Sequence, residues 1–140
     1  RRLVDLGADC LPNLGLALAG LTRELELSGR IAPAQAVLDY TRALELNPDL
    51  AWTRVHLGLT LLGLGRNAEA ISQFTAALRL NPDLAVAQYG WALALAGQGN
   101  FGLARGVLDR VRTTDPGSTL YGRTAALVDS METRGRAGAR

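Results

Sequence analysis

The chain has 140 residues, of which 48% are hydrophobic and 20% are charged, and its formal net charge is +2. This is the composition of an ordinary folded domain and excludes the disordered and collagen-like classes. All fifteen basic residues are arginine, so the chain lacks the lysine that a Walker phosphate-binding loop or a Schiff-base enzyme needs.

Sites that require several special residues are also excluded. Cys10 is the only cysteine and His56 the only histidine, which leaves no internal disulfide, no usual zinc site and no catalytic triad. Apolar runs such as 57–64 are far shorter than the roughly 20 residues of a membrane-spanning helix. We therefore expect no cofactor, no metal, no membrane span and no enzymatic activity. No feature of the sequence assigns a compartment.

The first segment, 1–12, precedes the first of four regularly spaced prolines. Pro12, Pro48, Pro82 and Pro116 are separated by 36, 34 and 34 residues. Because proline lacks the N–H that continues a helix, we predict that 1–12 is a separate helix. On this spacing it would be the second helix of a repeat whose first helix is not in this sequence.

Three full repeats follow, at 13–48, 49–82 and 83–116. Residues 43–51 read ALELNPDLA and residues 77–85 read ALRLNPDLA, so eight of nine positions are identical 34 residues apart. A fixed period of this length is typical of solenoid proteins. The first repeat is two residues longer than the others in the turn that contains Pro33.

Each full repeat is predicted to contain two helices. Apolar residues of the second repeat recur every three or four positions in two sets, Leu57, Leu61 and Leu64, then Ala70, Phe74 and Ala77. Gly65 and Gly99 suit the left-handed residue that ends a helix, and Asn67 and Asn100 suit the N-cap of the next.

The last predicted helix covers 117–134 and would be a first helix with no second helix after it. The tail at 135–140 is rich in glycine and arginine, a composition typical of a disordered end. The chain would thus run from a second-type helix at its start to a first-type helix at its end.

The repeat resembles the tetratricopeptide family, whose 34-residue helix-turn-helix unit has Leu-Gly in its first helix, alanines and an aromatic residue in its second, and a closing proline. The matching residues of the second repeat are Leu57, Gly58, Gly65, Ala70, Phe74, Ala77 and Pro82. The resemblance implies an all-α fold in which tandem helix-turn-helix units form a right-handed superhelical solenoid, and a non-enzymatic scaffold for protein interactions.

The resemblance also implies a concave groove lined by the first helix of each repeat. The residues predicted to line it are Trp52, Val55, His56, Leu59, Val86, Tyr89 and Leu93. Some family members hold a partner's C-terminal carboxylate with lysine and asparagine at positions that here carry Val55, Leu59, Tyr89 and Leu93. An apolar helix or peptide is therefore a better partner than a chaperone tail.

The two ends suggest a second function. A solenoid repeat buries its apolar face only against its neighbours, so a second-type helix at one end and a first-type helix at the other could stack head to tail between copies. The predicted end contacts are Leu3, Val4, Leu6, Leu120, Leu127 and Met131. Self-assembly into an oligomer or filament and capture of an apolar peptide by an adaptor domain of a larger protein both remain open at this point. The alternative for 117–134 is a solvating helix that closes the array.

A nucleic-acid partner is not expected. Arg105, Arg110 and Arg112 form the best basic cluster, but Asp109 and Asp115 interrupt it and the net charge is small. Balanced surface charge is the better interpretation.

Overall fold

The structure is a computed structural model that describes the backbone of residues 3–138 and the side chains of residues 11–138. Seven helices follow one another along this part of the chain: α1 (Leu3–Leu27), α2 (Pro33–Leu46), α3 (Ala51–Gly63), α4 (Asn67–Leu80), α5 (Ala85–Gly97), α6 (Phe101–Thr114) and α7 (Thr119–Gly138). No strand occurs among these residues, and none of the helices is long and apolar enough to cross a membrane. The predicted all-α fold is confirmed.

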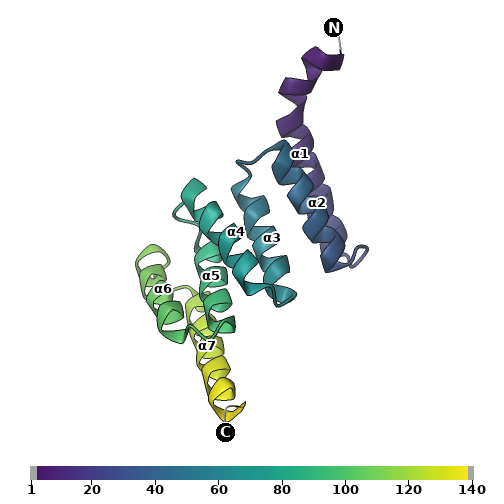
Figure 1. Cartoon of the computed structure of the whole chain (residues 1–140). Coiled ribbons are helices and arrows are strands. Elements are labelled where there is room, and N and C mark those ends of the chain that lie inside the picture. The colour runs from purple at the N-terminus through teal and green to yellow at the C-terminus, as the bar shows by residue number, and fades with distance from the viewer. Residues whose placement is uncertain (1–2, 139–140) are drawn as a thin grey trace.

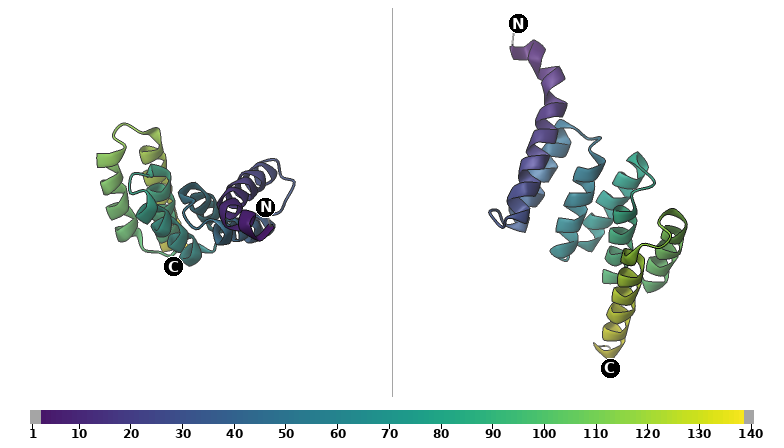
Figure 2. Two further views of the ribbon diagram at one scale, coloured as in Figure 1. Left: turned by 90° about the horizontal axis from the view of Figure 1, so that it is seen from above. Right: turned by 180° about the vertical axis from the view of Figure 1, so that it is seen from behind.

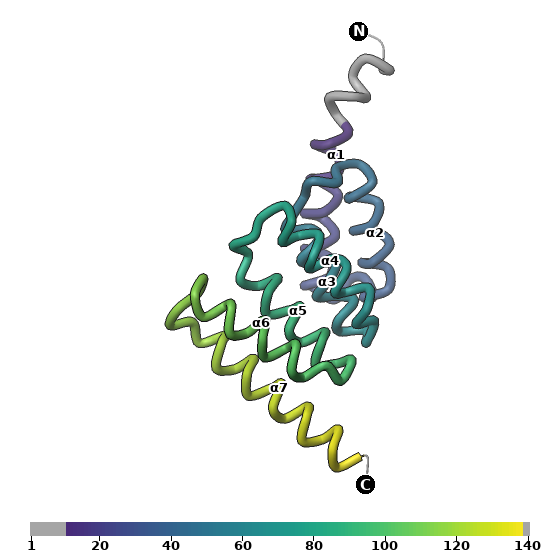
Figure 3. Tube along the Cα trace, turned by 60° about the vertical axis from the view of Figure 1, so that its left-hand side comes forward, coloured from purple at the N-terminus to yellow at the C-terminus, as the bar shows by residue number. Residues whose placement is uncertain are grey.

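Consecutive helices pack as antiparallel hairpins that stack side by side (Figure 1). Among the first helices, α5 contacts both α3 and α7, and the second helices α2, α4 and α6 lie between successive first helices. The pair α1 and α2 forms one end of the array and the pair α6 and α7 the other (Figures 1 and 2). The tube in Figure 3 shows the successive hairpins turning along a superhelical path.

The repeated sequence produces a repeated turn. Asn47 ends α2 and Asn81 ends α4, and each side-chain oxygen accepts a hydrogen bond of 3.2 Å from the N–H two residues later, in Asp49 and Asp83. The proline between them cannot extend the helix. Two identical turns therefore place α3 on α2 and α5 on α4 in the same way.

The turns inside each hairpin are made by glycine. Gly65 and Gly99 have φ angles of 76° and 84°, the left-handed conformation that glycine adopts without strain. This confirms their predicted role as helix stops. The predicted asparagine caps are wrong: Asn67 is the first residue of α4 and Asn100 makes no side-chain cap bond. Arg66 and Glu69 form an exposed ion pair at the start of α4 instead.

A single large side chain from each second helix fills the space between two first helices. Phe74 of α4 is completely buried between Gly58 of α3 and Gly90 of α5. A Cβ atom at Gly58 would lie 2.7 Å from the Phe74 ring, and one at Gly90 would overlap it. Tyr40 of α2 and Leu108 of α6 occupy the same place in the neighbouring repeats and are also buried. The small residue of the family pattern is therefore required by close helix packing.

The segment 1–12 does not form a separate helix, contrary to the sequence prediction. Residues 3–27 form one helix with Pro12 inside it. Proline weakens a helix by removing one hydrogen bond and by the clash of its ring. The ring of Pro12 is exposed, and its carbonyl accepts a hydrogen bond of 3.4 Å from the Asn47 side chain, so packing on the end of α2 supports the helix through this position. The described array thus begins and ends with a helix of the first type.

The terminal helix is longer than predicted. α7 reaches Gly138, so residues 135–138 of the glycine- and arginine-rich tail are helical. An ion pair of 2.8 Å between Arg136 and Glu132, one turn apart, supports this end of the helix. Local pairing outweighs the composition, which gave the opposite prediction.

Candidate functional site

Equivalent residues of the repeats line up across the first helices. The spacing is 34 residues between α3, α5 and α7, and 36 between α1 and α3 because of the longer first turn. Two of the resulting rows are partly or fully exposed, and we call them together the first-helix face. The first row is Leu16, Trp52, Val86 and Leu120, and the second is Arg23, Leu59, Leu93 and Leu127.

The first-helix face is apolar over most of its length. Trp52 is 53% exposed, and Leu16, Leu120 and Leu127 are also exposed, while Leu59, Val86 and Leu93 are half-buried. Apolar side chains left open in adjacent positions on packed helices are a feature of surfaces that bind other proteins. The face is therefore the main candidate for a binding site.

Two residues predicted to line the groove are not available for binding. Val55 is completely buried, and Tyr89 is buried in a core cluster with Leu108 and Val128. Both lie one helical turn from a face residue, but on the side turned toward the second helices. The spacing of apolar residues in the sequence did not show which of them face solvent and which face the second helices. The Tyr89 hydroxyl donates to Asp115 at 3.3 Å, and burial raises the pKa of this phenol.

The α1 end of the face is polar. The Glu26 carboxylate accepts hydrogen bonds from the hydroxyls of Tyr40, at 2.6 Å, and Thr60, at 2.5 Å. Burial, with a further contribution from Glu26, raises the pKa of Tyr40 well above its ordinary value. One carboxylate thus joins three helices, α1, α2 and α3.

Arg23 lies beside this carboxylate and is about one third exposed. Its guanidinium is 3.9 Å from Glu26, which is an ion pair without a hydrogen bond. Its N–H groups can therefore still donate to a ligand on the first-helix face. Sequence reasoning missed Arg23 and Glu26, although adding 36 to the number of Arg23 gives Leu59, which was predicted to line the groove.

His56 lies between two aromatic rings. Its ring centroid is 6.3 Å from that of Tyr40 and 6.2 Å from that of Trp52. The Nδ1 atom is buried without a hydrogen-bond partner in the described part of the chain. Burial, and then the charge of Arg23, lowers the pKa of His56. The imidazole is consequently neutral in the folded protein at neutral pH.

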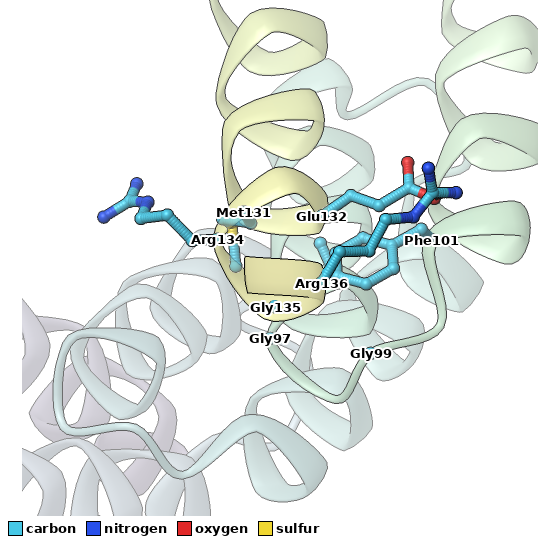
Figure 4. Close-up of a pocket in the computed structure, with 9 residues that line it drawn as sticks. Gly97, Gly99, Phe101, Met131, Glu132, Arg134, Gly135 and Arg136 are labelled. Atoms are coloured by element: carbon cyan, nitrogen blue, oxygen red, sulfur yellow. Dashed lines mark hydrogen bonds and ion pairs between the residues drawn. The ribbon is translucent and has the colours of Figure 1, made fainter. Parts of the chain in front are cut away.

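A surface hollow of about 610 Å³ lies between the C-terminal half of α7 and the turn that joins α5 to α6 (Figure 4). Phe101 and Met131 supply its apolar part, and Gly97 and Gly135 leave room because they have no side chains. Arg136 and Glu132 lie together at one side, whereas Arg134 points away from them (Figure 4). Met131, which was predicted as an end contact, is half-buried and lines this hollow.

The remaining predicted end contacts lie elsewhere. Leu120 and Leu127 are exposed and belong to the first-helix face. Leu3, Val4 and Leu6 are part of helix α1, but their side chains lie outside the described residues. The complementary ends on which head-to-tail stacking was based are absent from residues 3–138, because this stretch begins and ends with first-type helices.

Other chemistry has little support among the described residues. They contain no group of three or more histidine, cysteine, aspartate or glutamate side chains that could hold a metal ion. The arginine cluster is engaged in pairing: Arg105 contacts Asp129 and Glu132, and the Arg112 guanidinium lies 4.6 Å from the centre of the Tyr121 ring.

Comparison with known proteins agrees with the repeat pattern. A profile of the tetratricopeptide repeat matches residues 56–119. No curated protein sequence matches the chain. The Arabidopsis OM64 TPR domain superposes with a TM-score of 0.77 at 14% identity, covering 84% of this chain and 96% of that one.

Two further solved structures hold peptides. The second TPR domain of human RPAP3, in complex with the HSP70 peptide SGPTIEEVD, has a TM-score of 0.76 at 17% identity and covers 84% of this chain and 98% of its own. The first TPR of Spaghetti (RPAP3), bound to the HSP90 peptide SRMEEVD, has a TM-score of 0.74 at 17% identity, with coverages of 83% and 90%. At these identities the likeness concerns the fold.

Proposed function

Because the chain is a tetratricopeptide-repeat protein, whose fold is a scaffold for protein interactions, we propose that it is an adaptor. Its first-helix face would bind an apolar peptide or helix of another protein. The structural neighbours that hold HSP70 and HSP90 peptides support peptide binding as the use of this fold.

The observation that carries the proposal is the exposure of Trp52 at the centre of an apolar face. Aromatic side chains are enriched where protein interfaces gain most of their binding energy, and the centre of the His56 ring lies 6.2 Å from that of this indole. A tryptophan side chain has only two rotatable bonds, so it loses little entropy when a ligand covers it. Leu59 and Leu93 extend the apolar contact toward α5 and α7.

The polar α1 end of the first-helix face adds a second requirement for the ligand. Arg23 is partly exposed and is not hydrogen-bonded to Glu26, so it favours an acidic side chain or a C-terminal carboxylate at the α1 end. An arginine can hold such a group with two N–H donors. The expected ligand is therefore a mainly apolar segment with one acidic group at one end.

A selection experiment tests this proposal without a known partner. Random 12-residue peptides displayed on phage would be selected on the full chain, and the enriched peptides measured by fluorescence anisotropy. We expect at least two large apolar residues and one acidic group in the enriched peptides, and a loss of affinity of about tenfold or more for Trp52→Ala. Arg23→Gln should weaken only the peptides that contain the acidic group.

The matched control is Leu38→Ala, because Leu38 is an exposed apolar residue on the outer side of α2. This variant should bind as the original chain does. If Trp52→Ala and Leu93→Asp both left the affinity of every selected peptide unchanged, the first-helix face would not be the binding site and the proposal would be wrong.

Self-association is the alternative function, and one measurement separates it from the adaptor. Light scattering over a concentration series should give a constant monomer mass for an adaptor. Mass that grows with concentration, and that Leu127→Asp together with Met131→Asp abolishes, would support assembly through the α7 end instead.

A further inference from the structure

Helix α1 carries two apolar seams, and only one of them is covered. The first seam, which includes Gly15, Ala19 and Thr22, is buried against α2. The second consists of leucines spaced alternately three and four residues apart, and we call it the α1 seam: Leu11, Leu14, Leu18, Leu21 and Leu25. Three of these are exposed, and the other two are only half-buried. Such spacing is the pattern by which one helix packs along another.

The same positions are covered inside the array. Leu21 is 54% exposed, whereas its counterpart Leu57 in α3 is 3% exposed. Leu14 is 54% exposed, whereas Leu84, its counterpart before α5, is 6% exposed. The difference arises because α3 and α5 each have the second helix of the preceding repeat beside them, while no described helix lies beside the α1 seam.

Gly20 shows what kind of side chain is missing. Its counterpart Gly90 lies directly under the Phe74 ring of the preceding repeat, so that no Cβ atom would fit there. Around Gly20, a Cβ atom would meet nothing within 4 Å. The backbone at this position therefore has room for a ring of the kind that Phe74 places on Gly90.

The molecule contains two helices of the type that fits. α2 packs on α3 and α4 packs on α5. The inward residues of α2 are Ala36, Val37, Tyr40, Ala43 and Leu44, and those of α4 are Ala70, Ile71, Phe74, Ala77 and Leu78, with Ile71 and Leu78 partly buried. Both sets have the same spacing and chemistry. They run from a small residue to a β-branched one, then to an aromatic ring, a second small residue and a leucine.

We propose that the α1 seam is a docking site for an amphipathic helix of a partner protein that carries this five-residue pattern, with its aromatic ring over Gly20. The docked helix would occupy, on α1, the place that α4 occupies on α5. This site lies on α1, the first helix of the described residues, and is separate from the first-helix face.

A helix with the right pattern is available from the chain itself as a probe. A synthetic peptide with the sequence of residues 66–82, carrying fluorescein, would be titrated with the full chain and followed by anisotropy. Ala68→Glu and Ser72→Lys in the peptide, joined as a lactam, keep it helical, because both positions face solvent in α4 and a preformed helix loses less entropy on binding.

We expect saturable binding that Leu21→Asp weakens by about tenfold or more, as loss of a central contact does. Gly20→Phe should block the site to a similar extent, because the added ring fills the space over Gly20. Leu38→Asp, an equally drastic change at an exposed leucine of α2, should leave binding unchanged. A peptide with Phe74→Ala should bind at least about tenfold more weakly.

The result can fail in three distinct ways. Equal binding by Leu21→Asp, or no binding at about 1 mM chain, would overturn the proposal. A dimer in light scattering that Leu21→Asp dissolves would assign the α1 seam to a second copy and would also overturn it. Trp52→Ala should not affect this peptide, so the outcome here is independent of the proposed function of the first-helix face.

Discussion

The two ends of the array differ in what they leave exposed. At one end, α1 presents the leucines of the α1 seam. At the other end, the exposed residues spaced along the outer side of α7 are small or polar: Gly122, Ala126, Ser130 and Thr133. Ion pairs between Arg105 and the carboxylates of Asp129 and Glu132 fasten α7 to α6.

This difference shows that the ends have different roles. A solenoid needs a polar outer surface where its stacking stops, and the outer side of α7 has such a surface. α1 does not provide one, because its outward residues have the apolar character of an interior first helix. The outer surface of α1 is therefore suited to the stacking of a further helix, whereas the outer surface of α7 is not.

The largest expected effect contrasts a position covered by neighbouring helices, that of Phe74, with an uncovered position on the α1 seam, that of Leu21. Phe74→Ala removes a completely buried ring between α3 and α5 and should lower the free energy of unfolding by about 3–5 kcal/mol. Leu21→Ala, on the uncovered α1 seam, should lower the free energy of unfolding by less than about 1 kcal/mol, because half of the Leu21 side chain is already in water. Urea unfolding followed by circular dichroism measures both.

Leu103→Ala, at an exposed position of α6, serves as the control and should change stability by no more than about 0.5 kcal/mol. A loss for Leu21→Ala as large as that for Phe74→Ala would show that the α1 seam is covered in solution.

Alanine at the two equivalent glycines should act in opposite directions. At Gly90 the new methyl group meets the Phe74 ring, and such overpacking costs about 1–3 kcal/mol. At Gly20 the methyl group has free space, and alanine is the better helix former by about 1 kcal/mol. Gly90→Ala should therefore lower the melting temperature and Gly20→Ala should raise it. A loss of stability with Gly20→Ala would contradict the free space over Gly20.

The hydrogen bonds of Glu26 give a smaller effect at the join between the first and second repeats. Tyr40→Phe keeps the buried ring but removes the hydroxyl that donates to Glu26 at 2.6 Å. Leaving a partly buried carboxylate with one donor fewer should lower the free energy of unfolding by about 1–2 kcal/mol. Tyr121→Phe is the matched control, because the ring of Tyr121 is half-buried and its hydroxyl makes no hydrogen bond in the described part of the chain. Equal stability of the two variants would show that the Glu26 network contributes nothing.

The sequence predicted the repeats well because they depend on local features. The Asn-Pro-Asp turns and Gly65 act through their own backbone, so their spacing alone locates the hairpins. Pro12 misled the prediction because a proline in a solvent-exposed stretch of helix does not have to end it. The tail at 135–138 misled it because the pairing of Arg136 with Glu132 is not visible in composition.

The site was harder to predict because it depends on which side of each helix is covered. Val55 and Leu59 are one helical turn apart, yet only Leu59 reaches the surface. Arg23 escaped notice because the two additional residues before Pro33 shift the register of α1. The α1 seam was also not recognised, because leucines at helical spacing usually indicate a buried helix face. Only the structure shows that no described helix covers them.

The smallest predicted effect is a pH dependence of stability that arises from His56 of α3, a position covered by α2. His56 takes the place that glycine has in α1 and α5, and its ring faces Tyr40. Burial lowers its pKa below the ordinary value of 6.5, so between these two values the unfolded chain binds a proton that the folded chain does not. The free energy of unfolding should therefore fall as the pH is lowered from 7 to 5.

His56→Gln should remove this part of the pH dependence, and the difference between the two curves isolates it because His56 is the only histidine and most carboxylates titrate below pH 5. Urea unfolding at half-unit steps of pH provides the measurement. Parallel curves would mean that the pKa of His56 is the same in the folded and unfolded chain. A wild-type chain that gains stability relative to His56→Gln on acidification would mean that Glu26 raises this pKa and outweighs burial. Either result would show that burial does not dominate the environment of His56.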